Sequence, residues 1–369
     1  MVILLIPPNK DNYIRDTFYG CWHKAKLIDY SWPPTYLYQL NSIIKGSEVF
    51  DLSTIKFFDA LNLVLSDKPK LILINTGTVT IDQDKLFLKK IKSKINCKVI
   101  AFGQHPTVNP KDTLKDGVID ICIRGEIEDI INTVIKNISN KNILKKIKGV
   151  CFNEYISKNK NLIKNLDNLP IPTINKNKLY FNPLIVHEPY TTMLITRGCP
   201  FSCTFCTVPT IYGKTFRKKS IEKVIYEIKQ ILNQGYKEIF IRDENLTLDK
   251  KYLMKLCKEI IKNKLKFYWI CNSRVDTVDK KLINLMKQAG CHLIKFGVES
   301  SNQKVLDNLK KGITKKQIEY AFKICNELKI ETMGHFMIGN PDETIKDIHN
   351  TIEFAIKLDP TYASFDILI

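Results

Sequence analysis

The sequence predicts an α/β protein with an N-terminal Rossmann-like, doubly wound parallel sheet and a C-terminal partial (β/α)6 barrel. In the first 140 residues, short runs rich in Ile, Leu and Val alternate with segments of helical periodicity. A second alternation of the same kind begins near Thr191 and continues to the end of the chain. Continuous apolar strands that alternate with helices are typical of parallel sheets whose two faces are both covered.

The boundaries follow from composition. Residues 141–185 are rich in Lys and Asn, contain several Pro and show little periodicity. We therefore expect a domain at residues 1–140, a linker at 141–185 and a barrel at 186–369, which suits a chain of 369 residues. The chain stops inside or just after the last expected strand, so we expect a barrel that is minimal or truncated at its C-terminus.

The first domain is expected to contain five buried strands, at residues 2–7, 48–52, 70–75, 98–102 and 118–123. Amphipathic segments at 83–95 and 127–138 are expected to be helices between them. Ligands of such a sheet bind beyond the carboxyl ends of its strands. The dinucleotide fingerprint G-x-G-x-x-G is missing, which disfavours a nicotinamide or flavin domain.

The barrel is expected to contain six strands, at residues 193–196, 238–241, 267–271, 293–298, 332–338 and 362–369. The helices between them have local start and stop signals. Ser220 is placed to cap a helix that ends before Gly235, and Thr314 with Gln317 fits a capping box.

The formal net charge of +19 invites a nucleic-acid interpretation. However, only six of the 57 basic residues are Arg, and the many Lys are spread over several expected helix faces. This pattern indicates a solvated Lys-rich surface, and nucleic acid is not an expected partner. With no apolar stretch of spanning length and no signal peptide, we expect a soluble cytoplasmic protein.

Three of the 11 cysteines are clustered. Cys199, Cys203 and Cys206 have the spacing C-x3-C-x2-C and directly follow the first barrel strand. Three thiolates in one loop can face a common centre, and thiolates are the usual ligands of iron–sulfur clusters. The eight other cysteines stand singly, mostly among apolar residues, which is typical of small buried side chains.

Other uses of the three cysteines remain open. A structural zinc site needs four ligands, usually in two pairs, and no second pair is present; His187 is a candidate fourth ligand. A redox pair of Cys203 and Cys206 would leave Cys199 without a role.

At the segment Arg197–Cys206, with Phe205 just before the third cysteine, the sequence resembles the radical S-adenosylmethionine (SAM) superfamily. The resemblance covers residues 191–369. It implies that Cys199, Cys203 and Cys206 bind a [4Fe–4S] cluster whose fourth iron is left for SAM. It further implies reductive cleavage of SAM to a 5′-deoxyadenosyl radical, with an electron donor such as flavodoxin or ferredoxin.

The resemblance also implies roles at the ends of the other barrel strands, where the active sites of such barrels collect. Asp243 or Glu244 supplies acceptors for the SAM amino group. Arg274 is suited to a bidentate grip on the SAM carboxylate, and Glu299 to the ribose hydroxyls or the amine. Gly339 lets backbone groups approach the adenine edge. Taken singly, a carboxylate at a strand end is more often a helix N-cap or a surface residue, and it is the combination on one rim that favours a SAM site.

Nearly the full length resembles radical SAM proteins that have an N-terminal cobalamin-binding domain, a group that includes C-methyltransferases and an anaerobic porphyrin-ester cyclase. The local matches follow expected strands of the first domain and include Thr76, Thr78, Gly103 and His105. They imply a site for the corrinoid tail, with His105 as a neighbour of the corrin ring. The early D-x-H-x-x-G motif is absent, so cobalt would receive no His ligand from that loop.

The leading hypothesis is cobalamin-dependent C-methyl transfer to an unactivated carbon of a lipid, natural product or peptide. A radical SAM cyclase or rearrangement without cobalamin is the alternative within the same class. A non-catalytic iron–sulfur or RNA-associated protein is the alternative from another class. A methylthiotransferase is disfavoured, because it needs a second Cys triad in the first domain. No residue is assigned as catalytic beyond the cofactor ligands.

Overall fold

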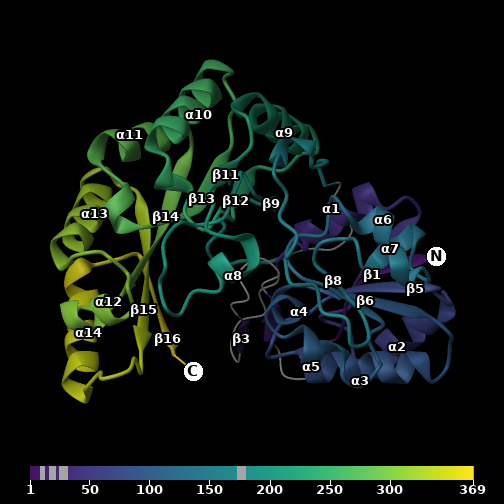
Figure 1. Cartoon of the computed structure of the whole chain (residues 1–369). Coiled ribbons are helices and arrows are strands. Elements are labelled where there is room, and N and C mark those ends of the chain that lie inside the picture. Colours follow the sequence, from purple (N-terminus) through teal and green to yellow (C-terminus); the bar gives the residue numbers. More distant parts are fainter. Residues whose placement is uncertain (9–12, 16–21, 25–31, 173–179, 369) are drawn as a thin grey trace. The chain divides into compact units, whose positions relative to one another are not determined.

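The computed structural model describes residues 1–8, 13–15, 22–24, 32–172 and 180–368 (Figure 1). The chain forms two compact units. The first comprises Met1–Leu184 and Thr210–Gly213, and the second comprises Ile185–Pro209 and Lys214–Ile369. None of the helices in these described ranges is long and apolar enough to cross a membrane.

The first unit is built on a six-stranded sheet. Its strands lie in the order β4 (Ser47–Asp51), β1 (Val2–Ile6), β5 (Leu71–Asn75), β6 (Lys98–Phe102), β7 (Ile121–Ile123) and β8 (Val150–Cys151). The first five are parallel, and β8 pairs antiparallel with β7 at the edge. The strand order therefore reverses between β1 and β5, the switch point at which doubly wound sheets bind ligands. The predicted Rossmann-like sheet is confirmed.

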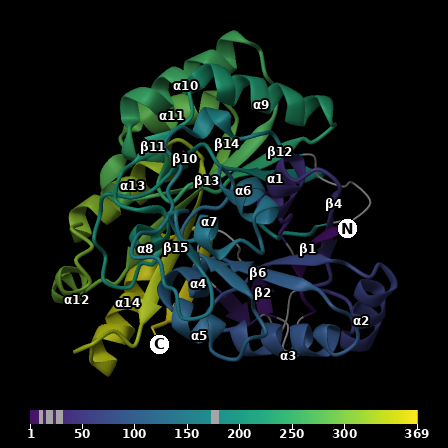
Figure 2. The same ribbon diagram turned by 45° about the vertical axis from the view of Figure 1, so that its right-hand side comes forward.

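Helices cover both faces of this sheet (Figures 1 and 2). One face carries α2 (Phe57–Ser66), α3 (Ile81–Lys92) and α5 (Pro110–Leu114); the other carries α1 (Thr35–Ile43), α6 (Ile131–Lys136) and α7 (Lys141–Leu144). A short helix, α4 (Gln104–Val108), follows β6. All five residues of β5 are buried, as expected for a central strand covered on both sides. Separately, β2 (Tyr13–Arg15) and β3 (Trp22–Lys24) form an antiparallel pair.

The segment at 141–185, expected to be a linker, clusters with the first unit up to Leu184. It contributes α7 and β8, and the single turn η1 (Leu166–Asn168) lies in a small apolar cluster with Ile163 and Leu169. The Gln39 amide donates to the Pro170 carbonyl at 3.1 Å. Residues 173–179 of this segment lie outside the described residues.

The second unit is a curved sheet of six parallel strands in sequential order. These are β9 (Tyr190–Met193), β12 (Glu238–Ile241), β13 (Tyr268–Ser273), β14 (Cys291–Glu299), β15 (Glu331–Ile338) and β16 (Tyr362–Ile367). The predicted partial (β/α)6 barrel is thus confirmed. The first strand ends earlier than predicted, because the amides of Ile195 and Thr196 bond to the Asp243 carboxylate. Thr196–Arg197 instead forms β10, which pairs with β11 (Arg217–Lys218).

Helices line the outer side of the curved sheet (Figure 1). They are α9 (Ile221–Asn233), α10 (Lys250–Lys262), α11 (Lys280–Gln288), α12 (Gln303–Asn308), α13 (Lys315–Glu327) and α14 (Ile345–Leu358), and shorter turns are α8 (Val208–Tyr212), η2 (Leu246–Leu248) and η3 (Val275–Thr277). Phe296 of β14 packs on Phe322 of α13, with the ring centroids 5.4 Å apart. The predicted caps are present: the Ser220 hydroxyl accepts from the Lys223 amide, and Thr314 and Gln317 form a reciprocal capping box.

Candidate active site

The cysteine loop lies at the carboxyl end of the barrel strands. Among the described cysteines, Cys199, Cys203 and Cys206 are the three that are not buried. The Thr204 amide donates to the Leu309 carbonyl at 3.0 Å, and the Cys206 amide donates to the Cys203 carbonyl at 3.2 Å. These backbone bonds fix the loop, in which Cys206 is close enough to Cys203 and Cys199 to interact with them electrostatically.

The chemistry of the three thiols fits a cluster better than a single metal ion. Burial raises the pKa of Cys199, and burial together with the neighbouring thiols raises the pKa of Cys206 to about 11. Both are therefore protonated at neutral pH and must release protons to become ligands. No three His, Cys, Asp or Glu side chains in the described part of the chain are arranged to hold one metal ion. A cubane spreads three thiolates over three irons, so this finding bears on zinc and not on a [4Fe–4S] cluster.

Asp243 holds the chain just before the cysteine loop. Its carboxylate accepts hydrogen bonds from the amides of Ile195 (2.7 Å) and Thr196 (2.9 Å) and from the Thr196 hydroxyl (2.7 Å). It is fully buried, and burial raises its pKa to about 6 against these bonds. Its oxygens are thus committed to the fold of the loop entrance.

Glu244, the next residue, is in a different position. Its Oε2 is buried and has no hydrogen-bond partner within the described part of the chain. Burial raises its pKa to about 8, and the adjacent Asp243 adds to the rise while Arg197 and the Gly198 amide oppose it. Glu244 also acts electrostatically on the Cys199 thiol. A carboxyl oxygen that is beside the loop and lacks a donor is suited to bind a cationic or N–H-bearing ligand.

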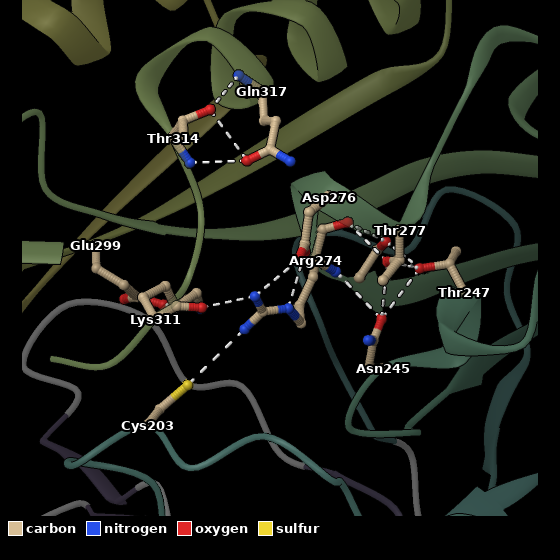
Figure 3. Close-up of polar contacts among 11 residues, drawn as sticks. Cys203, Asn245, Thr247, Arg274, Asp276, Thr277, Glu299, Lys311, Thr314 and Gln317 are labelled. Carbon is tan, nitrogen blue, oxygen red and sulfur yellow. Dashed lines mark hydrogen bonds and ion pairs between the residues drawn. The ribbon is translucent and has the colours of Figure 1, made fainter. Parts of the chain in front are cut away.

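Arg274 contacts the cysteine loop itself (Figure 3). Its Nη1 donates to Cys203 Sγ at 3.8 Å, and its guanidinium carbon lies 3.6 Å from the ring centroid of Phe201. Its Nε and Nη2 each donate to a carboxylate oxygen of Asp276 at 2.9 Å, and Nη2 also donates to the Lys311 carbonyl at 2.6 Å. Most of the donors expected to grip a SAM carboxylate are therefore already bonded.

Glu299 stands at the end of β14 in a left-handed conformation, with φ of 68°. The register of β14 against β15 shifts between Gly297 and Glu299, which turns the chain out of the ladder. Glu299 Oε1 accepts from Lys311 Nζ at 2.6 Å, and both side chains are buried. Only one oxygen of this carboxylate is used by Lys311, so the second oxygen is left for a ligand hydroxyl.

Gly339 lies in the turn after β15 with φ of 79°, a conformation that favours glycine. Its amide donates to Glu343 Oε2 at 2.8 Å, as does the Asn340 amide at 3.0 Å. The Gly339 N–H is thus used inside its own turn, and its carbonyl is the group left to contact a ligand.

In the first unit, Thr76 and Thr78 follow β5 at the switch point of the sheet. The Thr76 hydroxyl donates to the buried carboxylate of Asp84 at 2.6 Å, so it fastens the loop to α3. The Thr78 side chain is exposed apart from a contact with His105. Thr78 is therefore better placed than Thr76 to meet a ligand.

Gly103 and His105 follow the adjacent strand, β6. Gly103 has φ of 109°, and a Cβ there would lie 2.9 Å from the Thr76 carbonyl oxygen, so only glycine allows this close approach of the two loops. His105 is buried; its Nδ1 lies 3.2 Å from Thr78 Oγ1 and its Nε2 3.0 Å from Asp112 Oδ2. Both ring nitrogens are engaged, so His105 braces this loop cluster and is not poised as a cobalt ligand.

Three residues at the barrel rim escaped sequence reasoning: Asp276, Lys311 and Phe201. Asp276 is two residues from Arg274, and Phe201 lies between Cys199 and Cys203, so their closeness in sequence to these residues could have indicated a role at the site. Lys311 is one lysine among many, and only the fold brings it to Glu299.

The fold and this rim define a parallel β/α barrel that carries a three-cysteine loop and buried carboxyl groups at the carboxyl ends of its strands. The chain belongs to the radical SAM superfamily, which residues 193–355 match. It is accordingly a radical SAM enzyme, whose cofactors are a [4Fe–4S] cluster and SAM and whose chemistry requires a one-electron reductant.

Known relatives extend the match beyond the barrel. The chain is 32% identical to an uncharacterized methyltransferase of Pyrococcus horikoshii over 100% of this chain and 80% of that protein. It is 27% identical to the anaerobic magnesium-protoporphyrin IX monomethyl ester cyclase of Cereibacter sphaeroides over 91% of this chain, and spans 58% of that protein's length. The structure of TsrM, a radical SAM methyltransferase from Kitasatospora setae solved with cobalamin and a [4Fe–4S] cluster, is 17% identical and superimposes with a TM-score of 0.78 over 99% of this chain and 72% of that one. This last likeness concerns the fold.

Proposed function

We propose that the protein is a cobalamin-dependent radical SAM C-methyltransferase in which Cys199, Cys203 and Cys206 ligate the cluster. The observation that carries the proposal is the partial exposure and grouping of these three thiols in one loop at the barrel rim, while the other described cysteines are buried. When bound, the reduced cluster supplies the electron that cleaves SAM into methionine and a 5′-deoxyadenosyl radical.

For SAM itself, we assign Glu244 to the amino group and Glu299 to the ribose hydroxyls or the amine. The unpartnered Oε2 of Glu244 supports the first assignment. Asp243 is left to shape the loop entrance, and the Gly339 turn is left to contact the adenine through its carbonyl. The contacts of Arg274 favour a role toward the cysteine loop over the SAM carboxylate.

Below the rim, apolar side chains close the barrel. Phe240, Ile270 and Leu293 are paired in register across three strands, and each is at most 1% exposed. Side chains in register lie on one face of a sheet. Phe296 is three residues beyond Leu293 on the same strand, so its side chain lies on the opposite face, where it packs on helix α13. This layer therefore faces the barrel interior, where it keeps water from the site of radical chemistry.

For the corrinoid, we propose the switch point of the first unit, at the loops that contain Thr78 and Gly103. The strand order, the close approach of the loops at Gly103 and the whole-chain relationship to a methyltransferase support this site. Cobalamin, when bound, supplies the methyl group that is transferred to the substrate radical. We propose an unactivated carbon of a small molecule, lipid or peptide as the acceptor, and a flavodoxin or ferredoxin as the electron donor.

A second candidate is a radical cyclisation or rearrangement without cobalamin. It is favoured by the relationship to the porphyrin-ester cyclase and by the engagement of both His105 ring nitrogens.

The test is SAM cleavage by anaerobically reconstituted protein with dithionite as reductant, followed through 5′-deoxyadenosine and methionine. We expect product from the wild type and from a Cys97→Ala control, whose cysteine lies in the core of the first unit. We expect no product and no cluster iron from Cys199→Ala, Cys203→Ala or Cys206→Ala. If two of these three single variants still bound the cluster, the assignment of the cysteines as its ligands would be refuted.

A further inference from the structure

The side chain of Arg274 is fixed from its own strand end rather than from the cysteine loop. The two carboxylate oxygens of Asp276 accept hydrogen bonds from Nε and Nη2 at 2.9 Å each, and the Lys311 carbonyl accepts a second hydrogen bond from Nη2 at 2.6 Å. These three bonds define the plane of the guanidinium, because its donors form a rigid fork. They leave Nη1 directed at Cys203 Sγ (Figure 3).

The backbone of Arg274 is held equally firmly. Its amide donates to Asn245 Oδ1 at 3.2 Å, and its carbonyl accepts from the hydroxyls of Ser273 (3.1 Å) and Thr277 (2.9 Å). The Thr247 hydroxyl bonds to the same Asn245 oxygen at 3.0 Å. This buried hydroxyl and amide group is drawn with Arg274 in Figure 3. It gives Arg274 a position that does not depend on the loop it contacts.

On the loop side, the guanidinium covers the ring of Phe201, with its carbon 3.6 Å from the ring centroid. Phe201 lies between Cys199 and Cys203, so stacking and the N–H···S contact act on the same short segment. Desolvation strengthens both contacts, since Arg274 is only 5% exposed.

We propose that Arg274 is a positioning residue that holds the Cys203 sulfur and raises the reduction potential of the cluster. The inference rests on the proposed function, in which Cys203 is a cluster ligand. Reduction adds negative charge to the cluster and its sulfurs, and an N–H donor and a nearby cation stabilise that charge. Asp276 offsets part of the cationic charge while it keeps the fork aimed.

The experiment measures the midpoint potential of the cluster in SAM-free full-length protein, by following the EPR signal of the reduced cluster during a redox titration. We expect Arg274→Gln to shift the midpoint to lower potential. Arg274→Lys, which keeps the charge but loses the fork, should give a smaller shift in the same direction. Asp276→Asn should shift the midpoint upward, because it removes the offsetting negative charge. Lys262→Gln, a change at an exposed lysine on α10, is the control for net charge and should leave the potential unchanged.

The outcomes separate this inference from the proposed function. Iron and sulfide content of the wild type tests the cluster first, and its absence would reject the proposed function. If the wild type holds the cluster and the Arg274 variants titrate at the wild-type potential, the positioning role is rejected. Unchanged potentials with weakened SAM binding would instead assign Arg274 to the SAM carboxylate. If Arg274→Gln fails to assemble a cluster, the other two variants are compared. A lower midpoint potential in Arg274→Lys and a higher one in Asp276→Asn support the positioning role, and wild-type potentials in both reject it.

Discussion

Asp243 and Glu244 are neighbours at the end of β12, yet the fold gives them different tasks. The carboxylate oxygens of Asp243 accept hydrogen bonds from the amides of Ile195 and Thr196, whereas one buried oxygen of Glu244 has no donor among the described residues. Sequence alone left the choice between them open, because both are acidic and both follow the same strand. The difference arises from which side of the strand each carboxyl leaves, and therefore from which backbone it meets.

This difference leads to a prediction for SAM binding. Glu244→Gln should weaken SAM binding by about 10- to 100-fold, since a hydrogen bond to a charged group contributes roughly 1.5–3 kcal/mol. Burial raises the pKa of Glu244 to about 8, so the protein must lose this proton before the carboxylate can bind the SAM amine. The advantage of wild type over variant should therefore grow as the pH rises from about 6 to about 8.

Anaerobic equilibrium binding of SAM at several pH values checks this prediction. Equal cluster content in the two proteins is the necessary control. A ratio of affinities that is constant across this pH range would show that Glu244 does not bind the SAM amine.

At the scale of elements, strands were predictable where apolar runs were long and ended at polar residues. The expected strand at 238–241 is β12, and that at 332–338 is β15 with one residue added. The first barrel strand was predicted three residues too late, because Asp243, more than 40 residues away, captures the amides that would continue it. The cysteine loop was predictable from spacing, whereas the role of Arg274 depends on contacts with Asp276 and Lys311 that only folding creates.

Asp120 offers a test of how elements of the first unit are joined. It lies just before β7, where its carboxylate accepts from Lys92 of α3, from Lys98 of β6 and from the Val99 amide, each at 2.9 Å. Burial alone would raise the pKa of Asp120, but these hydrogen bonds outweigh it and the pKa is lowered. Because the pKa of Asp120 is lowered, its ionised carboxylate stabilises the fold at any pH above about 4, the pKa of Asp in the unfolded chain. This stabilisation is lost as the pH falls through the lower pKa of the folded protein.

We therefore expect Asp120→Asn to lower the free energy of unfolding of the first unit by about 1–2 kcal/mol at pH 7, a value reduced for the exposure of Lys98. The difference from wild type should shrink as the pH falls below about 4. Urea unfolding at a series of pH values measures it. A difference that persists undiminished in acid would trace the effect to packing and not to the carboxylate.

At the scale of the whole molecule, the chain combines two α/β units with separate cores and separate candidate cofactor sites. The cluster ligands belong to the second unit, and the loops at the switch point of the sheet belong to the first. Hydrogen bonds within the first unit, from Thr76 to Asp84 and from His105 to Asp112, shape the latter loops. Their geometry therefore does not depend on whether the cysteines carry a cluster.

It follows that corrinoid binding should survive removal of the cluster. We expect the variant with Cys199, Cys203 and Cys206 all replaced by Ala, purified without oxygen in the presence of cobalamin, to lose iron–sulfur absorbance and to keep stoichiometric corrinoid bands. Gly103→Val should reduce these bands, because its Cβ would meet the Thr76 carbonyl and push the two loops apart. If the triple variant is colourless while the wild type holds a cluster and cleaves SAM, cobalamin is not bound by the first unit alone. A wild type that also lacks corrinoid would then favour cyclisation or rearrangement without cobalamin.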